Sequence, residues 1–199
     1  INICTIDIEV GSENGFPEPD QALYEIITIT IKNNNGSIYH TWGTKEFNAD
    51  KCTQSVLYRK CADERDLLLD FLEYWENHIP DIITGWYSDS FDIPYIVNRI
   101  RRILGDDAIL GLSPWRRVEV NDKKIAGKEI PGFNIVGVSQ LDYIDLFKKF
   151  TLNTLGQQES YKLDHIANVV LGEKKLDYSE HGSLHLLYKH DYQKFVEYN

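Results

Sequence analysis

Two acidic side chains near the start of the chain, Asp7 and Glu9, are spaced so that they could bind metal ions together. The segment around them, residues 1–10, is rich in β-branched residues and predicts a strand, in which residues i and i+2 point to the same face. Two carboxylates side by side on a strand repel each other. A hard cation such as Mg²⁺ removes that repulsion by binding the carboxylate oxygens. The alternative is the ordinary polar face of an edge strand, because Asp-x-Glu is frequent by chance.

A third carboxylate, Asp92, follows a short apolar stretch and a glycine-containing loop. Residues 81–86 predict a short buried strand, and residues 93–104 predict an amphipathic helix. Asp92 stands where the loop meets the helix, and its ordinary role there would be N-capping. Its functional role would be that of a third metal-binding carboxylate. In a two-metal site one ion activates the attacking water and the other stabilises the leaving oxygen of a phosphodiester.

The elements that must position these acids form a mixed pattern of strands and helices, which predicts an α/β architecture with helices on the faces of a mixed sheet. Strands are expected at 24–32, 37–42 and 134–141, with a turn at 33–36 and a polar hairpin at 117–130 that turns near Asn121 and Asp122. Further helices are expected at 63–78, with Asp63 as its cap, and at 142–150, 161–171 and 184–198.

Composition limits the class of protein. The chain has 199 residues, of which 42% are hydrophobic, and this is enough for one domain with a buried core. Its net charge of −10 argues against a module that only coats nucleic acid. Three cysteines with irregular spacing give neither a disulfide framework nor a zinc pattern, and indicate a reduced intracellular protein. The sequence shows no signal peptide or membrane span, so we expect a cytoplasmic location.

The start of the chain already looks like a core strand, and the sequence contains no methionine. We therefore expect residues 1–199 to be a single domain cut from a longer protein at both ends.

These features together resemble the 3′→5′ exonuclease (proofreading) domain of family B DNA polymerases. Asp7-Ile8-Glu9 looks like the first exonuclease motif, and residues 84–95 look like the second. Residues 141–150 are similar to a stretch in the replicative polymerases of T-even-like bacteriophages. The resemblance covers nearly the whole chain. It implies a ribonuclease H-like fold and two divalent cations, Mg²⁺ or Mn²⁺, and the order of elements is compatible with that fold.

The resemblance also implies roles for individual residues. Asp7, Glu9 and Asp92 would bind the metals, and Tyr198 would match the tyrosine of the third motif, Tyr-x-x-x-Asp, which helps to orient the attacking water. The chain ends at Asn199, so the matching aspartate is expected three positions beyond it, and the chain alone is expected to be weakly active. The alternative is that Tyr198 is only an aromatic on a helix face.

One residue departs from the family pattern. Tyr87 stands where the second motif usually has an asparagine that helps to hold the 3′ end of the strand. Tyr87 could instead stack on a base, and Phe16 and Phe91 are similar candidates, because base–aromatic stacking tolerates any sequence. The alternative for each aromatic side chain is plain packing.

Basic residues between the second motif and the hairpin, Arg99 among them, could contact phosphates, but solvated surface positions are the simpler interpretation for most of them. The six histidines show no metal-binding spacing and are taken as surface residues. The partners that the resemblance implies are a single-stranded DNA 3′ end, a polymerase domain in the same parent chain and a sliding clamp.

Two other functions stay open from the sequence. One is a catalytically weak or inactive ribonuclease H-like scaffold that only binds DNA. The other is a free-standing exonuclease that uses histidine in place of tyrosine, but no histidine near the C-terminus has an aspartate at the required spacing.

Overall fold

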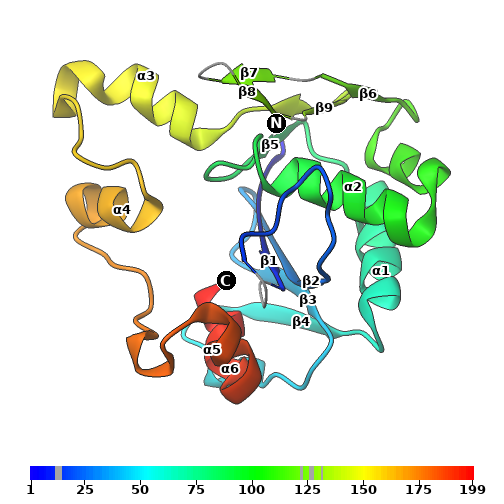
Figure 1. The fold of residues 1–199 in the computed structure, drawn as a ribbon, viewed down its shortest axis with the longest axis horizontal. Coiled ribbons are helices and arrows are strands. Elements are labelled where there is room, and N and C mark those ends of the chain that lie inside the picture. Colours follow the sequence, from blue (N-terminus) through cyan, green and yellow to red (C-terminus); the bar gives the residue numbers. More distant parts are fainter. Residues whose placement is uncertain (12–14, 122, 126–127, 131) are drawn as a thin grey trace.

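The centre of the protein is a six-stranded mixed sheet with the strand order β10-β5-β1-β2-β3-β4 (Figure 1). The structure is a computed structural model that describes residues 1–11, 15–121, 123–125, 128–130 and 132–199. The strands of the sheet are β1 (Ile3–Val10), β2 (Ile26–Asn33), β3 (Tyr39–Gly43), β4 (Val56–Lys60), β5 (Ile82–Thr84) and β10 (Ser139–Gln140). β1 lies inside the sheet, antiparallel to β2 and parallel to β5.

Helices α1 and α2 pack on this sheet and α5 and α6 pack beside it, whereas α3 and α4 stand away from it at the left of the view (Figure 1). The α-helices are α1 (Glu64–Asn77), α2 (Asp92–Leu104), α3 (Tyr143–Leu155), α4 (Leu163–Leu171), α5 (Leu184–His190) and α6 (Tyr192–Tyr198). Short 3₁₀ turns lie at η1 (Ala49–Lys51), η2 (Asp106–Leu112) and η3 (Ser179–His181). A search of the described residues for a helix both long and apolar enough to cross a bilayer finds none.

The alternation of β2 decides which side chains enter which layer. Ile29 and Ile31 belong to the main hydrophobic core with residues of α1 and α2. In that core Phe71 of α1 packs edge-on against Trp42 of β3, with ring centroids 5.5 Å apart. Thr28 and Thr30 point to the opposite face, where they meet the end of α6. The two faces of the sheet therefore differ: one is apolar under α1 and α2, and on the other the two threonines lie beside a smaller apolar cluster of Ile27 with residues of α5 and α6.

Several expectations from the sequence are confirmed. The turn at 33–36 joins β2 and β3 as an antiparallel pair, and β2 lies next to β1. The helix expected at 63–78 is α1, and the Asp63 side chain accepts a hydrogen bond from the Asp66 N–H at its start. The helix expected at 184–198 is interrupted after His190, where α5 ends and α6 begins.

Two predicted strand regions are organised differently. The hairpin at 117–130 does not turn near residue 121, because β6 (Val118–Val120) pairs with β9 (Phe133–Ile135), and β7 (Lys123–Ile125) pairs with β8 (Lys128–Ile130). Asp122 lies outside the described residues. The strand expected at 134–141 is divided into β9 and β10, because Gly137 adopts a positive φ of 96° and turns the chain between them. β4 had no expected counterpart.

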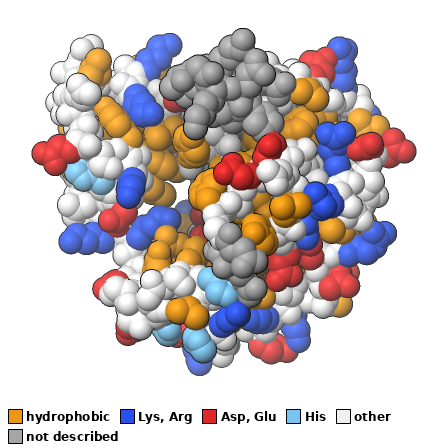
Figure 2. Space-filling model, viewed as in Figure 1, with side chains coloured by type: hydrophobic (Ala, Val, Ile, Leu, Met, Phe, Trp, Pro, Cys, Tyr) orange, Lys and Arg blue, Asp and Glu red, His pale blue; other side chains and the backbone are white. Residues whose placement is uncertain are grey.

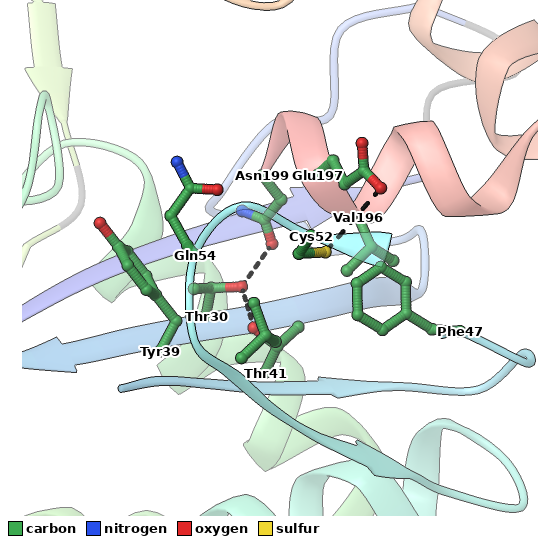
Figure 3. Close-up of a pocket in the computed structure, with 10 residues that line it drawn as sticks. Thr30, Tyr39, Thr41, Phe47, Cys52, Gln54, Val196, Glu197 and Asn199 are labelled. Carbon is green, nitrogen blue, oxygen red and sulfur yellow. Dashed lines mark hydrogen bonds between the residues drawn. The ribbon is translucent and has the colours of Figure 1, made fainter. Parts of the chain in front are cut away.

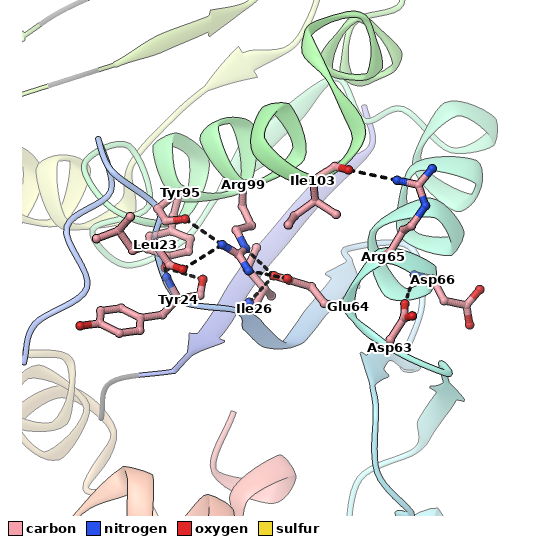
Figure 4. A network of polar contacts seen from close by, with 11 residues as sticks. Leu23, Tyr24, Ile26, Asp63, Glu64, Arg65, Asp66, Tyr95, Arg99 and Ile103 are labelled. Carbon is pink, nitrogen blue, oxygen red and sulfur yellow. Dashed lines mark hydrogen bonds and ion pairs between the residues drawn. The ribbon is translucent and has the colours of Figure 1, made fainter. Parts of the chain in front are cut away.

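Arg99 is not on a solvated face, contrary to the sequence interpretation. It is buried, and its guanidinium makes two hydrogen bonds to the Glu64 carboxylate, at 2.7 and 2.6 Å. It also donates to the backbone carbonyls of Ala22 and Leu23, each at 3.0 Å (Figure 4). Glu64 in turn accepts the N–H of Ile26. A buried ion pair thus fastens the segment before β2 to α1 and α2.

His40 is likewise not a plain surface residue. Its ring is half-buried against Tyr74, with ring centroids 4.9 Å apart. Burial lowers the pKa of His40, and the nearby charges of Arg59 and His78 lower it further.

Candidate active site

Asp7 and Glu9 lie side by side on one face of β1, where their partners on β2 are Thr30 and Thr28. Both acids are half-buried, and burial is the main cause that raises the pKa of each carboxyl, that of Glu9 to about 8. The charge of Asp7 raises the pKa of Glu9 further. Negative charge on this pair is therefore disfavoured, and a cation bound between the carboxylates would relieve it.

Asp92, the first residue of α2, brings a third carboxylate against β1. Its Oδ1 accepts a hydrogen bond of 3.1 Å from the backbone N–H of Ile8, the residue between the two acids. β5 pairs with β1 only as far as Thr5, so this edge of β1 is open beyond Thr5 in the described sheet. There the Asp92 carboxylate accepts the N–H of Ile8. Burial of Asp92 raises its pKa well above the usual range, and the charges of Asp7 and then Glu9 add to the effect. The structure thus brings the three acids together.

The N-capping role expected for Asp92 is wrong. The N-cap of α2 is Phe91, whose side chain makes no capping hydrogen bond. The loop itself satisfies the first helical N–H groups, since Ile93 N donates to the carbonyl of Ser88 and Tyr95 N to that of Phe91. The carboxylate of Asp92 is therefore released from capping and turns toward β1.

The donor set suits a hard divalent cation, although the described residues include no group of three or more His, Cys, Asp or Glu side chains already spaced to hold one. Burial is the main cause that raises the pKa values of Asp7, Glu9 and Asp92, and the nearby charge of Lys175 only partly offsets it at Asp7 and Glu9. Carboxylate oxygens are the ligands that Mg²⁺ and Mn²⁺ prefer. The chemistry of the three side chains fits such an ion.

Tyr198 lies at the end of α6 and is tied to a lysine that the sequence interpretation missed. Lys175 Nζ donates to the Tyr198 hydroxyl at 3.2 Å and lies 4.5 Å from the centroid of its ring. The same ammonium lowers the pKa of both Asp7 and Glu9 by its charge. Burial opposes the charge of Lys175, but Tyr198 and the two carboxylates outweigh it and raise the pKa of the lysine. Lys175 is thus a cation shared between Tyr198 and the acid pair.

Asn199 completes the polar face of the sheet. Its Nδ2 donates to Asp7 Oδ2 at 3.2 Å, and its Oδ1 accepts from the hydroxyls of Thr28 and Thr30 at 2.7 and 3.0 Å. Figure 3 shows the chain of hydrogen bonds continuing from Thr30 to Thr41 at the wall of a pocket of about 220 Å³. The amide of Asn199 separates this pocket from Asp7 and fixes one oxygen of its carboxylate.

The three aromatic candidates occupy neighbouring segments. Phe16 is 70% exposed, and its ring centroid lies 5.6 Å from that of Phe91, which is half-buried. Tyr87 is 46% exposed and starts the turn that leads to Phe91, whose N–H donates to the Tyr87 carbonyl. Exposed rings therefore stand on the loop directly before Asp92 and on the segment after β1.

An open hollow of about 520 Å³ adjoins Tyr198 and Lys175, and Lys174, Tyr178 and Asp164 also line it. Figure 2 shows this face of the molecule hollowed between the α3–α4 segment and the body that contains the sheet. Hydrophobic side chains are exposed in the hollow, and Lys or Arg side chains stand around it. The surface beside the acids is therefore an open hollow lined by acidic, basic and aromatic side chains.

Similarity to known proteins agrees with this geometry. The model of the DNA polymerase family B exonuclease domain matches residues 1–166. The chain is 34% identical over its full length to the DNA-directed DNA polymerase of Escherichia phage RB69 and 32% identical to that of Enterobacteria phage T4, and it spans 24% of the length of each. It is 27% identical, over 89% of its length, to the DNA polymerase catalytic subunit of Equine herpesvirus 2, of which it spans 18%. The chain therefore belongs to the exonuclease domain of family B DNA polymerases, a nuclease domain of ribonuclease H-like fold.

Proposed function

We propose that this chain is the proofreading 3′→5′ exonuclease domain of a DNA-directed DNA polymerase, and that it removes 3′-terminal nucleotides from single-stranded or mismatched DNA. The observation that supports the proposal best is the hydrogen bond from Ile8 N to Asp92, since Ile8 is the residue between Asp7 and Glu9. Membership of the family supports the reaction class.

In the proposed mechanism Asp7, Glu9 and Asp92 would hold two divalent cations, Mg²⁺ or Mn²⁺. The chemistry supplied there would be activation of a water and stabilisation of the leaving oxygen. Tyr198, held by Lys175, orients the water through its hydroxyl. The water oxygen bonds to the terminal phosphorus and the P–O3′ bond to the preceding nucleotide breaks. The products are a nucleoside 5′-monophosphate and a strand that is one residue shorter and ends in a 3′-hydroxyl.

The DNA strand is held by Phe16, Tyr87 and Phe91 in this proposal. The exposure of Phe16 and Tyr87, and the contact of Phe16 with Phe91 just before Asp92, favour stacking on the last bases of the strand. Tyr87, which replaces the amide of the usual motif, supplies a stacking surface rather than a hydrogen bond.

The chain spans only 24% of the phage polymerases that it resembles, and we propose that a polymerase domain of the same parent chain is its main partner. That domain would deliver the 3′ end of the primer, and a sliding clamp would act through the parent protein. The proposed place of action is the cytoplasm of an infected host cell.

The test uses the parent protein that contains this chain, without deoxynucleoside triphosphates. Single-stranded DNA labelled at its 3′-terminal nucleotide is incubated with Mg²⁺, with Mn²⁺ or with chelator. Release of labelled mononucleotide with either metal and none with chelator supports the proposal. A protein that binds the strand without cleaving it under all three conditions is the inactive scaffold instead.

A further inference from the structure

The loop that carries Tyr87 rests on one buried carboxylate, Asp142, which has no part in the mechanism above. Asp142 is 4% exposed. Its Oδ1 accepts the N–H of Tyr87 at 2.9 Å, and its Oδ2 accepts the N–H of Asp89 at 3.1 Å. Oδ1 also accepts the N–H of Ile144 at 3.1 Å, as the N-cap of α3. One side chain therefore joins the start of α3 to two backbone groups of the loop before Asp92.

Asp142 is itself held firmly by the sheet. The strand before it, β10, pairs with β5, and the pairing continues past its end, since Leu141 N donates to the Ile83 carbonyl and Tyr143 N to the Gly85 carbonyl, both within 3.0 Å. The Thr84 hydroxyl adds a bond of 2.6 Å to the carbonyl of Leu141. The carboxylate thus stands on a fixed base, from which it can impose a conformation on the loop.

The loop needs such an imposed conformation at Tyr87. This residue has a φ of +70°, in the left-handed region that a residue with a Cβ avoids. Backbone strain of this kind persists only where surrounding contacts hold the backbone in place, and it is common at functional sites. Here the hydrogen bonds from Tyr87 N and Asp89 N to Asp142 hold the backbone, while the Tyr87 ring remains 46% exposed.

We propose that Asp142 is a positioning residue for substrate binding: it fixes the strained backbone at Tyr87 and so aims the Tyr87 ring at the bases of the 3′ end. The inference rests on the proposed exonuclease function and deepens it, because it assigns strand binding to a carboxylate outside the metal-binding set. Asp142 acts through Tyr87 and touches neither the metals nor the scissile phosphate.

The test compares Asp142→Asn, Asp142→Ser and the control Asp145→Asn in the parent protein. The amide of Asn turns an NH₂ group toward backbone N–H groups, and so loses an acceptor where three donors converge. Ser keeps an N-cap for α3 but is too short to reach the loop. Asp145 lies in the first turn of the same helix and is exposed, so its substitution removes the same charge without touching the loop.

Two substrates separate strand binding from chemistry. On single-stranded DNA, Asp142→Asn and Asp142→Ser should raise KM about tenfold, the size of one lost base–aromatic stack, while kcat changes less than about twofold. On bis(p-nitrophenyl) phosphate, which has a scissile phosphodiester but no base, both variants should match the unsubstituted protein. Asp145→Asn should behave as unsubstituted on both.

A double-mutant cycle shows whether Asp142 acts through Tyr87. Tyr87→Ala should raise KM as Asp142→Ser does, and the double variant should be no worse than either single one. Additive losses, an unchanged KM in the Asp142 variants, or equal losses on both substrates would overturn the inference. An unsubstituted protein without metal-dependent cleavage would instead overturn the proposed function. Far-ultraviolet circular dichroism and the melting temperature show whether each variant is folded. If Asp142→Asn does not fold, the comparison is made with Asp142→Ser.

Discussion

Asp92 Oδ1 lies 3.1 Å from the backbone nitrogen of Ile8, so the first turn of α2 is bonded to β1 between the two acids of that strand. The position of Asp92 is therefore fixed by the main chain of the sheet, which does not depend on a side-chain rotamer. Among the described contacts, no main-chain group of another element binds the carboxylate of Asp7 or Glu9. The Asn199 side chain donates to Asp7 instead, and the charge of Lys175 acts on Glu9. This difference predicts different results for substitutions at the acids.

Asp7→Ala should lower kcat on single-stranded DNA by on the order of a thousandfold, because it removes a metal ligand. Folding should survive. Burial raises the pKa of Asp7, so its charge opposes the folded state when no metal is present, and the melting temperature in chelator should stay the same or rise. Mononucleotide release and thermal melts measure the two effects. Asp20→Ala, an exposed acid, is the control. Cleavage by Asp7→Ala at the unsubstituted rate would contradict the proposed mechanism.

Glu9 should make the metal-free protein less stable as the pH rises. Its folded pKa of about 8 lies above the ordinary glutamate pKa of 4.5, chiefly through burial and then through the charge of Asp7. Between these values the unfolded chain releases the proton and the folded chain keeps it, so stability falls from about pH 5 to about pH 8. Urea unfolding of the unsubstituted and Glu9→Gln proteins in chelator, over this range, isolates the contribution. The difference should shrink when Mg²⁺ is added; an equal pH slope in both proteins would count against the assigned pKa.

Lys175→Met should lower kcat by on the order of tenfold to a hundredfold, because Tyr198 loses its partner and the acid pair loses a positive charge. The charge of Lys175 lowers the pKa of Asp7 and Glu9, so without it both values rise. The acid limb of the pH–rate profile should then move to higher pH. Lys51→Met, at an exposed lysine in η1, is the control and should leave the profile in place. A Lys175→Met profile that falls in amplitude without moving would mean that the lysine does not act on the acids.

Arg99→Met should destabilise the fold by about 3–5 kcal/mol, because it leaves the Glu64 carboxylate buried without its partner. Arg101→Met on the same helix breaks only an exposed pair with Asp106 and should cost less than about 1 kcal/mol. Urea unfolding measures both. The double variant Arg99→Met, Glu64→Leu should recover part of the loss, since it removes the unpaired charge but also the acceptor of the Ile26 N–H. Equal effects of Arg99→Met and Arg101→Met would show that the burial of the pair is unimportant.

The sequence predicts those parts of the site that depend on local spacing. The alternation of β1 places Asp7 and Glu9 on one face, and the helical spacing of apolar residues predicts α1 and α2. Both patterns arise within one element and need no knowledge of its neighbours.

The remaining contacts depend on how distant segments meet. Lys175 lies in an irregular segment between α4 and η3, where no periodicity indicates its direction, and it reaches Tyr198 only because that segment folds back. The bond between Asp92 and Ile8 depends on where β5 ends. The burial of Arg99 depends on Glu64, 35 residues away, and a charged residue in a helix gives no sign of such a partner.

The open edge of β1 beyond Thr5 also bears on how an inactive enzyme should be made. An uncovered strand edge is a template for pairing with another chain, and here a single carboxylate covers it. Replacing Asp92 by alanine would remove catalysis and would also expose the N–H of Ile8, which could then pair with another chain. Replacing Asp7 leaves the Asp92 carboxylate bonded to this N–H. Trapping an uncleaved strand on this protein therefore calls for the change at Asp7, and loss of activity at Asp92 is interpretable only beside a measurement of aggregation.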